Sequence, residues 1–312
     1  MTKQATKPTI SATAQQLLTT YEHHLANVLD LRPVTIRNYI SDLRLFMAWC
    51  ERTWQNSDSE TVFSPERVAT PTVTRYRDYL QCDLDRKPNT VNRYLMSIKR
   101  YFSWATDTEV ISHDPTRSVK LVAQTLRPPR HLSDVEEEAL IRAVIQSCNL
   151  RDLTLITVML HTGLRISEVC NLKWEHVVRR KRSGYLRIWG KRNKYCEVPL
   201  NVTARKALKK YEEENESAEP QAGSYVFVSQ RTKTRLTPRG IGFLIAKYAG
   251  RANVENLRPH NLRHRFGYRM AEKVPLHRLA QIMGHDSLDT TLIYIQGTQQ
   301  DLQQAVEQIA WE

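Results

Sequence analysis

Residues 119–132 interrupt the helical periodicity of this chain, and they constrain its fold more than any other feature. The segment reads VKLVAQTLRPPRHL, with a Pro-Pro pair and three basic residues. Proline fixes the backbone and removes a hydrogen-bond donor, so we interpret the segment as an extended linker. A chain of 312 residues is long enough for two domains, each with its own core. We therefore expect one domain at 8–118 and another at 133–312.

The first of these segments carries the pattern of a helical bundle. Apolar residues recur at helical spacing from Leu17 to Val28, and a second amphipathic helix begins near Pro33. A third helix is expected from about Pro71 and a fourth directly after Lys87. The polar stretch 55–64 reads as a loop. This half is predicted to be all-helical, with four or five helices.

The second segment mixes helices with a few short strands. A capping-box pattern at Ser133 opens a helix, and the apolar stretch 150–160 predicts a buried central helix. Alternating or apolar runs at 185–189, 195–200 and 225–228 predict strands. The whole chain is therefore expected to be mainly α with a small antiparallel sheet (α+β) in its second domain. Residues 298–312 form an amphipathic pattern that predicts a tail helix.

Charge and cysteine usage limit the classes of partner and compartment. The formal net charge is +13, with 16 basic and 13 acidic residues in 1–125 and 30 basic and 20 acidic residues in 126–312. Such a balance favours polyanions, nucleic acid before an anionic membrane. The five cysteines are scattered without a C-x-x-C pair, which argues against a disulfide framework and a zinc site. The polar N-terminus and the lack of a long apolar run indicate a cytoplasmic protein with no membrane span.

One stretch near the C-terminus places phosphate-compatible side chains just before a tyrosine. It reads RPHNLRHRFGYRMAEKVPLHRLAQIMGHDSLDTTLIY, from Arg258 to Tyr294. His260 and Arg263 are three residues apart and would lie on one face of a helix. His285 lies in a Gly-His-Asp-Ser turn, and Tyr294 follows nine residues later. Taken singly, each of these features is more often a solvated face, a turn or a packed side chain.

Two further basic clusters precede this stretch. In HTGLRISE, Gly163 permits a turn, and Arg165 and Glu168 then lie one helical turn apart. In WGKRNKY, glycine and asparagine suggest a hairpin with Lys191 at its mouth. The sequence contains neither a phosphate-binding P-loop pattern nor H-E-x-x-H, so ATP and metal-dependent hydrolysis are disfavoured.

Taken in order, these clusters resemble the motif set of the tyrosine recombinases, the phage-integrase and Xer-like family of site-specific DNA recombinases. The resemblance spans the second half of the chain. It implies a two-domain DNA clamp, with an all-helical, SAM-like core-binding domain at 8–118 and a catalytic domain at 133–312. The patterns at 35–39 and 90–94 (TIRNY and TVNRY) are similar to that family's core-binding domain, but more weakly.

The resemblance also implies the roles of particular residues. The catalytic set would be Arg165, Lys191, His260, Arg263, His285 and the nucleophile Tyr294, with Glu168 in support. Arginines suit the stabilisation of phosphate oxygens because their planar fork binds two oxygens and stays charged. Tyrosine attack would give a 3′-phosphotyrosyl link and a free 5′-hydroxyl, Lys191 would protonate the leaving oxygen, and nearby cations would favour the phenolate. No cofactor, metal or ATP is expected.

Six basic residues, four in the first domain and two in the second, are candidate DNA contacts. They are Lys87, Arg93, Lys99, Arg100, Arg192 and Lys194. Their alternative interpretation is a solvated helix face or loop. The recombination outcome stays open between integration, excision or resolution of a mobile element or replicon, and inversion.

The expected partners are a double-stranded recombination site, further copies of the chain and possible accessory DNA-binding proteins. Dimers and a synaptic tetramer would assemble through the tail helix, although docking on its own domain is the alternative. Other functions remain to be distinguished: a monomeric type IB topoisomerase, a DNA-binding regulator without catalysis, and an RNA-binding module. The expected location is the cytoplasm of a prokaryote, with the nucleoid.

Overall fold

The chain forms two compact units, Met1–Leu126 and Arg127–Glu312. The computed structural model describes residues 8–55, 62–124, 129–189, 195–215, 223–284, 288–294 and 306–307. Each unit has its own hydrophobic core. The described residues are mostly helical, with one three-stranded antiparallel sheet in the second unit, which confirms the predicted fold class. The division falls inside the expected linker, while the domain bounds themselves stay a prediction.

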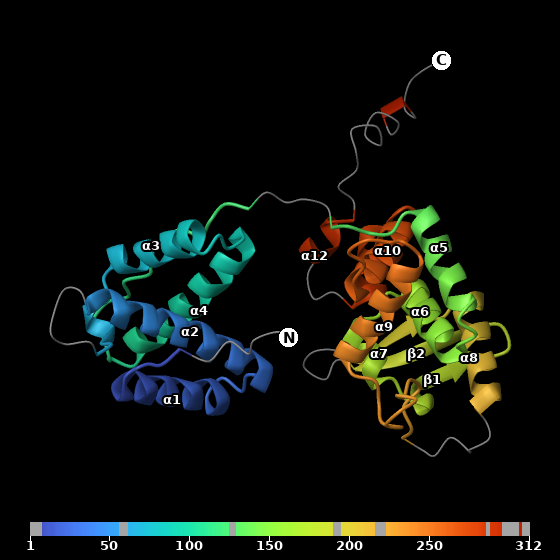
Figure 1. Cartoon of the computed structure of the whole chain (residues 1–312), viewed down its shortest axis with the longest axis horizontal. Coiled ribbons are helices and arrows are strands. Elements are labelled where there is room, and N and C mark those ends of the chain that lie inside the picture. The colour runs from blue at the N-terminus through green and yellow to red at the C-terminus, as the bar shows by residue number, and fades with distance from the viewer. Residues whose placement is uncertain are drawn as a thin grey trace. The chain divides into compact units, whose positions relative to one another are not determined.

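The first unit is all-helical in its described part (Figure 1). Its elements are α1 (Ala12–Asn27), α2 (Pro33–Trp54), the 3₁₀ turn η1 (Pro65–Arg67), α3 (Thr70–Asp78), the π turn η2 (Tyr79–Asp83) and α4 (Pro88–Asp107). Proline occupies the first turn of α2, α3 and α4, where its missing N–H is not needed. These starts confirm the helix predictions made from Pro33, Pro71 and Lys87.

Helix α2 holds this unit together, because it packs against α1, α3 and α4. Its Phe46 is fully buried among the rings of Phe63, Tyr76 and Phe102. The buried carboxylate of Glu51 accepts hydrogen bonds from the backbone N–H groups of Ser11 and Phe63. Glu51 thereby ties the segment before α1 to the segment that leads to α3.

The second unit carries more elements around a buried central helix. They are α5 (Asp134–Ile145), α6 (Leu150–Thr162), α7 (Ile166–Asn171), the 3₁₀ turn η3 (Trp174–His176), β1 (Val177–Arg179), β2 (Gly184–Trp189), β3 (Tyr195–Pro199), α8 (Val202–Asn215), α9 (Pro238–Arg251), α10 (Pro259–Ala271), α11 (Leu276–Met283) and α12 (Asp289–Leu292). The predicted capping box is present: Ser133 N–H donates to the Glu136 carboxylate, and Glu136 N–H donates to Ser133 Oγ.

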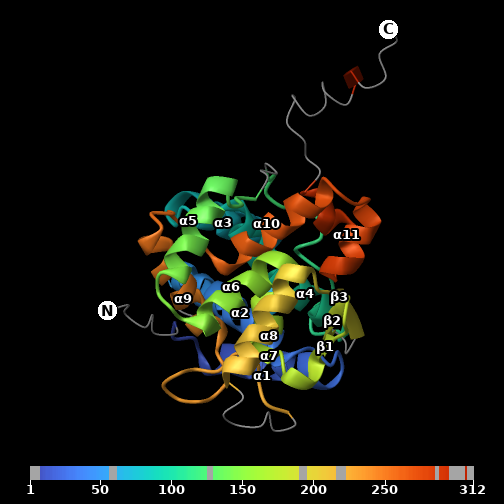
Figure 2. The same ribbon diagram turned by 90° about the vertical axis from the view of Figure 1, so that its right-hand side faces the viewer.

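Helix α6 is the predicted central helix, and α5, α8 and α10 pack around it (Figure 2). Its residues 154–160 are all buried. The sheet has the order β1-β2-β3, and β2 pairs with β3 from Tyr185 opposite Pro199 to Trp189 opposite Tyr195. Strand β1 was not predicted, because it is only three residues long and its last residue, Arg179, belongs to the basic stretch 179–182, which was interpreted as a turn.

The strand predicted at 225–228 is wrong. Tyr225 and Val228 form only isolated bridges, to Lys173 and Arg235. The apolar run is nevertheless buried at Val226 and Phe227, so the pattern indicated burial without a ladder. The predicted tail helix at 298–312 lies outside the described residues except for 306–307, which are helical.

Candidate active site

A glycine turn between α6 and α7 presents Arg165. Gly163 ends α6 in the left-handed conformation, with φ of 63°, which a β-carbon would strain. An added β-carbon would also lie 2.3 Å from the ring of Phe266 on α10. Arg165 then caps α7: its backbone N–H donates to Glu168 at 2.7 Å, and its guanidinium donates to the same carboxylate at 2.9 Å. Glu168 thus holds Arg165 in place, while its supporting role in catalysis stays a prediction.

Arg263 lies inside the same part of the fold. It extends from α10, is 3% exposed, and donates to the carbonyl oxygens of Gly163 and Met283. The next carbonyl, that of Gly284, accepts from Arg165 at 3.0 Å. The two predicted arginines, distant in sequence, are therefore brought together between the end of α6 and the end of α11. Burial, and then the proximity of Arg165, lower the pKa of Arg263 to about 10, so it stays charged at neutral pH.

His260 starts the helix that carries Arg263. It keeps an exposed edge, and its ring centroid is 4.2 Å from that of His264, one turn further along α10. Partial burial and the nearby charges of Arg263 and Arg165 lower the pKa of His260. Its ordinary value is near 6.5, so the imidazole is neutral at pH 7 and can either donate or accept a hydrogen bond.

Tyr294 follows α12 and packs back onto α10. Its side chain is 5% exposed, and its hydroxyl lies 3.1 Å from Nδ1 of His264. The ring also meets the Tyr268 ring edge to face, with centroids 5.3 Å apart. Gly267 makes this seat possible, because a β-carbon there would lie 2.6 Å from two ring atoms of Tyr294. Neither His264 nor Gly267 was predicted from the sequence as a site residue.

The electrostatics around Tyr294 differ from the expectation based on its neighbours. Arg263 and Arg165 do lower the pKa of the phenol, as expected. Burial acts in the opposite direction and is the larger effect, so the pKa of Tyr294 is raised to about 12. The tyrosine is therefore a protonated phenol at neutral pH, and nearby cations alone do not make it a phenolate.

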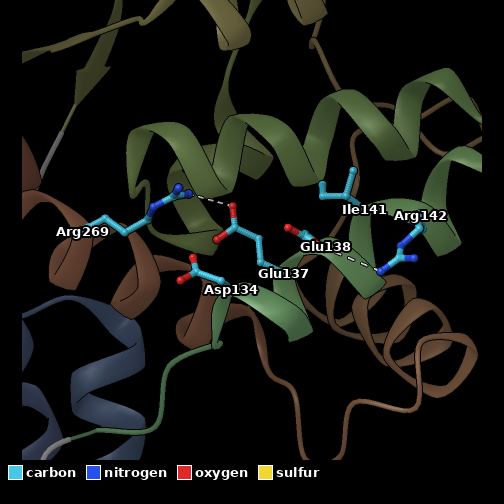
Figure 3. Close-up of a pocket in the computed structure, with 6 residues that line it drawn as sticks. All are labelled: Asp134, Glu137, Glu138, Ile141, Arg142 and Arg269. Atoms are coloured by element: carbon cyan, nitrogen blue, oxygen red, sulfur yellow. Dashed lines mark hydrogen bonds and ion pairs between the residues drawn. The ribbon is translucent and has the colours of Figure 1, made fainter.

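Helix α10 is held from its other side by α5. Arg265, which is 7% exposed, forms ion pairs with Asp134 and Glu137, and Arg269 forms one with Glu137 at 2.8 Å. Figure 3 shows the Arg269 to Glu137 pair at one end of a surface pocket that these acidic residues line. These pairs fix the helix that also carries His264 and Gly267.

Some predicted site residues lie outside the described residues. They are Lys191, Arg192, Lys194 and His285. Their chain neighbours are described: Trp189 and Tyr195 form the last pair of β2 and β3, and Gly284 ends α11 with φ of 59°. Strand β3 contacts α11, and the Cys196 thiol donates to the carbonyl of Gln281 at 3.8 Å.

The predicted DNA contacts of the first unit lie at or near α4. Lys87 and Arg100 are exposed, and Arg100 stacks over the ring of Tyr39. Arg93 is 48% exposed and donates to both carboxylate oxygens of the buried Asp42 at 2.7 Å. Lys99 is half-buried and donates to the carbonyl of Thr116. Arg93 and Lys99 therefore hold this unit together, whatever else they contact.

Within the described ranges, no helix is long and apolar enough to cross a membrane. The same part of the chain contains no group of three or more His, Cys, Asp or Glu side chains arranged to hold a metal ion.

Known proteins resemble this chain over most of its length. The model of the phage integrase family matches residues 130–301. The tyrosine recombinase XerD of Ralstonia nicotianae is 32% identical over 268 residues, which cover 83% of this chain and 82% of that protein. The crystal structure of the XerH site-specific recombinase on its palindromic difH substrate has a TM-score of 0.75 at 20% identity, covering 95% of this chain and 84% of that one. The Tn1549 transposon integrase with transposon right-end DNA has a TM-score of 0.74 at 19% identity, covering 96% and 99%. The chain belongs to the phage integrase family of tyrosine recombinases.

Proposed function

We propose that this protein recombines DNA at specific sites, cutting and rejoining strands through a 3′-phosphotyrosyl intermediate. One observation carries the proposal: Tyr294 is seated on α10, the helix that also supplies Arg263 and His260. Arg165 reaches the same place through its contact with Gly284. A tyrosine nucleophile beside two arginines suits phosphodiester cleavage without a metal ion.

In the proposed reaction the two arginines bind the non-bridging oxygens of the scissile phosphate. The phosphate gains negative charge as the fifth oxygen approaches, and fixed cations stabilise that charge. The carbonyls of Gly163, Met283 and Gly284 position both guanidinium groups before substrate binds. His260, neutral and at the exposed edge, adds a hydrogen bond, and His285 is assigned a similar role by its place after Gly284.

The bond changes conserve the energy of the DNA backbone. The oxygen of Tyr294 attacks phosphorus, and the 5′-oxygen leaves with a proton from Lys191, which follows the end of β2 in the sequence. The 5′-hydroxyl of another strand then attacks the phosphotyrosyl link and releases the tyrosine. Because each step exchanges one phosphodiester for another, no ATP is needed, and in this proposal the two arginines supply the positive charge that a metal ion would otherwise supply.

The proposal extends to assembly and biological context. The lambda integrase structure similar to this chain is a dimer on its core site, and the Tn1549 integrase structures contain transposon DNA. We infer that this chain acts in the cytoplasm, with the nucleoid, as a synaptic tetramer on paired sites, serving integration, excision or resolution of a mobile element or replicon. The all-helical domain at 8–118 would complete a clamp around the DNA, with Lys87, Arg93, Lys99 and Arg100 as contacts.

Covalent capture tests the proposed chemistry. The protein is incubated with fragmented genomic DNA of its source, and the adducts that survive denaturation are sequenced to find the cleaved site. A suicide substrate with a nick beside that site then traps the adduct on a denaturing gel. We expect an adduct from the wild type and from Tyr268→Phe, which keeps its ring beside Tyr294, and none from Tyr294→Phe.

The other candidate functions give different results in the same assay. Tight specific binding without an adduct would indicate a regulator that lacks catalysis. Relaxation of supercoiled DNA by a monomer, with no defined site, would indicate a topoisomerase.

Deleting residues 298–312 should leave binding of one protein copy intact but weaken cooperative assembly, and unchanged cooperativity would contradict the role of the tail.

A further inference from the structure

One face of α10 is shaped to receive the ring of Tyr294. His264, Gly267 and Tyr268 are three and four residues apart, so they lie on the same side of the helix. Gly267 leaves space for the ring, and Tyr268 meets it edge to face. His264 brings its Nδ1 to 3.1 Å from the phenol oxygen, and it is itself only 7% exposed. The seat therefore places one nitrogen base in direct contact with the attacking atom.

A buried phenol needs such a base. Burial favours the protonated form of Tyr294 more strongly than Arg263 and Arg165 favour its phenolate. The proton must therefore leave the oxygen while the bond to phosphorus forms, because a phenol oxygen becomes a much stronger acid as it bonds to phosphorus. When imidazole carries its proton on Nε2, Nδ1 accepts a hydrogen bond and can take up a proton.

We propose that His264 accepts the proton of Tyr294 during strand cleavage and returns it during strand rejoining. This inference rests on the proposed function. In cleavage, the bond between Tyr294 Oη and phosphorus forms, the bond from phosphorus to the 5′-oxygen breaks, and the phenolic proton moves to Nδ1. In rejoining, an incoming 5′-hydroxyl attacks phosphorus and gives its proton to Lys191, the bond from phosphorus to the phenol oxygen breaks, and the imidazolium of His264 returns its proton to that oxygen. The phosphate brings a negative charge that offsets the cost of a second cation beside Arg263.

This role separates His264 from the other basic residues of the site. His260 and Arg263 lie on the same helix, and His264 is the residue whose ring nitrogen lies 3.1 Å from the phenol oxygen. Lys191 is assigned to the leaving group, because it donates a proton to the departing 5′-oxygen and does not act on the attacking phenol. Loss of His264 should therefore impair the attacking group alone.

The test measures single-turnover adduct formation on the suicide substrate with His264→Asn. Asparagine keeps a polar atom near the position of Nδ1 but cannot hold the proton. We expect unchanged DNA binding and a cleavage rate that falls by ~10²-fold or more. His277→Asn, the same change at an exposed position on α11, is the matched control and should cleave at the wild-type rate.

A more acidic nucleophile distinguishes proton transfer from a structural role. A fluorinated tyrosine incorporated at position 294 loses its proton more readily, so it should restore most of the rate to His264→Asn. A rate within about threefold of wild type for His264→Asn would overturn the proposal. A lowered rate that the fluorinated residue does not restore would also overturn it, because His264 would then only shape the seat.

The contact can be tested without any His264 variant. Nitrogen NMR of labelled histidine should show a shifted His264 Nδ1 resonance in Tyr294→Phe, where the hydroxyl is missing. An unchanged resonance would overturn the proposal even if His264→Asn failed to fold. Absence of any adduct from the wild type would instead refute the proposed function, so the two failures can be told apart.

Discussion

Replacing Gly267 with alanine should push Tyr294 off its seat. The new β-carbon would lie 2.6 Å from Cε1 and Cζ of the ring, whereas carbon atoms pack at about 3.5–4.0 Å. The ring must therefore retreat by about 1 Å. That shift lengthens the 3.1 Å contact between the phenol and His264 beyond hydrogen-bond range. A displacement of about 1 Å at a reacting atom is enough to slow the cleavage step by ~10²-fold.

The free energy of unfolding should change much less than the rate. Overpacking costs about 1–3 kcal/mol, while alanine is favoured over glycine inside a helix by about 1 kcal/mol. The net loss for Gly267→Ala is therefore about 0–2 kcal/mol. Denaturant unfolding measures this value, and adduct formation on the suicide substrate measures the rate.

Two further variants isolate the clash. Gly242→Ala lies within α9, where a β-carbon meets nothing within 4 Å, so it should stabilise the protein slightly and leave cleavage unchanged. In a Tyr294→Ala background the ring is gone, and Gly267→Ala should then be stabilising by about 1 kcal/mol. Equal destabilisation in both backgrounds, or wild-type cleavage by Gly267→Ala, would refute the proposed seat.

Three more predictions concern charged or titrating groups. Glu168→Gln removes the carboxylate that holds Arg165, so the cleavage rate should fall about tenfold and the free energy of unfolding by about 1 kcal/mol. An unchanged cleavage rate in the suicide-substrate assay would contradict this. Tyr294 should ionise near pH 12, and the phenolate absorbance that is missing in Tyr294→Phe measures this midpoint. A midpoint near pH 10 would contradict the effect of burial. Because the pKa of Tyr294 is higher in the folded than in the unfolded protein, its contribution to stability is lost as the pH rises from 10 towards 12. Arg93→Met should cost about 1–2 kcal/mol in denaturant unfolding, because the buried Asp42 carboxylate loses its cation and keeps only its hydrogen bond from Ser97. The cost should be almost nothing in an Asp42→Asn background, and equal costs in both backgrounds would exclude this cause.

The parts of the fold that could be predicted from sequence are those that local chemistry determines. The N–H groups in the first turn of a helix have no partner within the helix, so proline is tolerated there and a capping side chain such as Ser133 is favoured. The helix starts at Pro33, Pro88 and Ser133 could be predicted because these preferences depend on only a few neighbouring residues. The turn at Gly163 is of the same kind, because only its backbone conformation is required. The run at 225–228, buried at Val226 and Phe227, shows the limit, because its backbone partners lie in separate segments near 172–173 and 235–236 that its own sequence pattern does not indicate.

The seat of Tyr294 could not be predicted for a related reason. His264 and Tyr294 are thirty residues apart, and their contact depends on how α12 folds back on α10. A weak signal was present, because His264, Gly267 and Tyr268 have helical spacing and a glycine inside a helix often marks a close contact. The sequence indicated that nearby arginines lower the pKa of the Tyr294 phenol. It did not show how deeply the phenol is buried, so it could not show that burial raises this pKa by more than the arginines lower it.

The contacts of the two arginines explain why the site needs a base as well as cations. Carbonyl oxygens of Gly163, Met283 and Gly284, which carry no net charge, accept hydrogen bonds from the two guanidinium groups, and Arg165 is held in addition by its ion pair with Glu168. In the proposed reaction the scissile phosphate binds to these two cations, which stabilise the charge of its transition state. The same burial that fixes Arg263 also surrounds Tyr294 and keeps its phenol protonated. Positioning the electrophile and activating the nucleophile thus require different residues, and His264 is the residue in contact with the atom that must lose its proton.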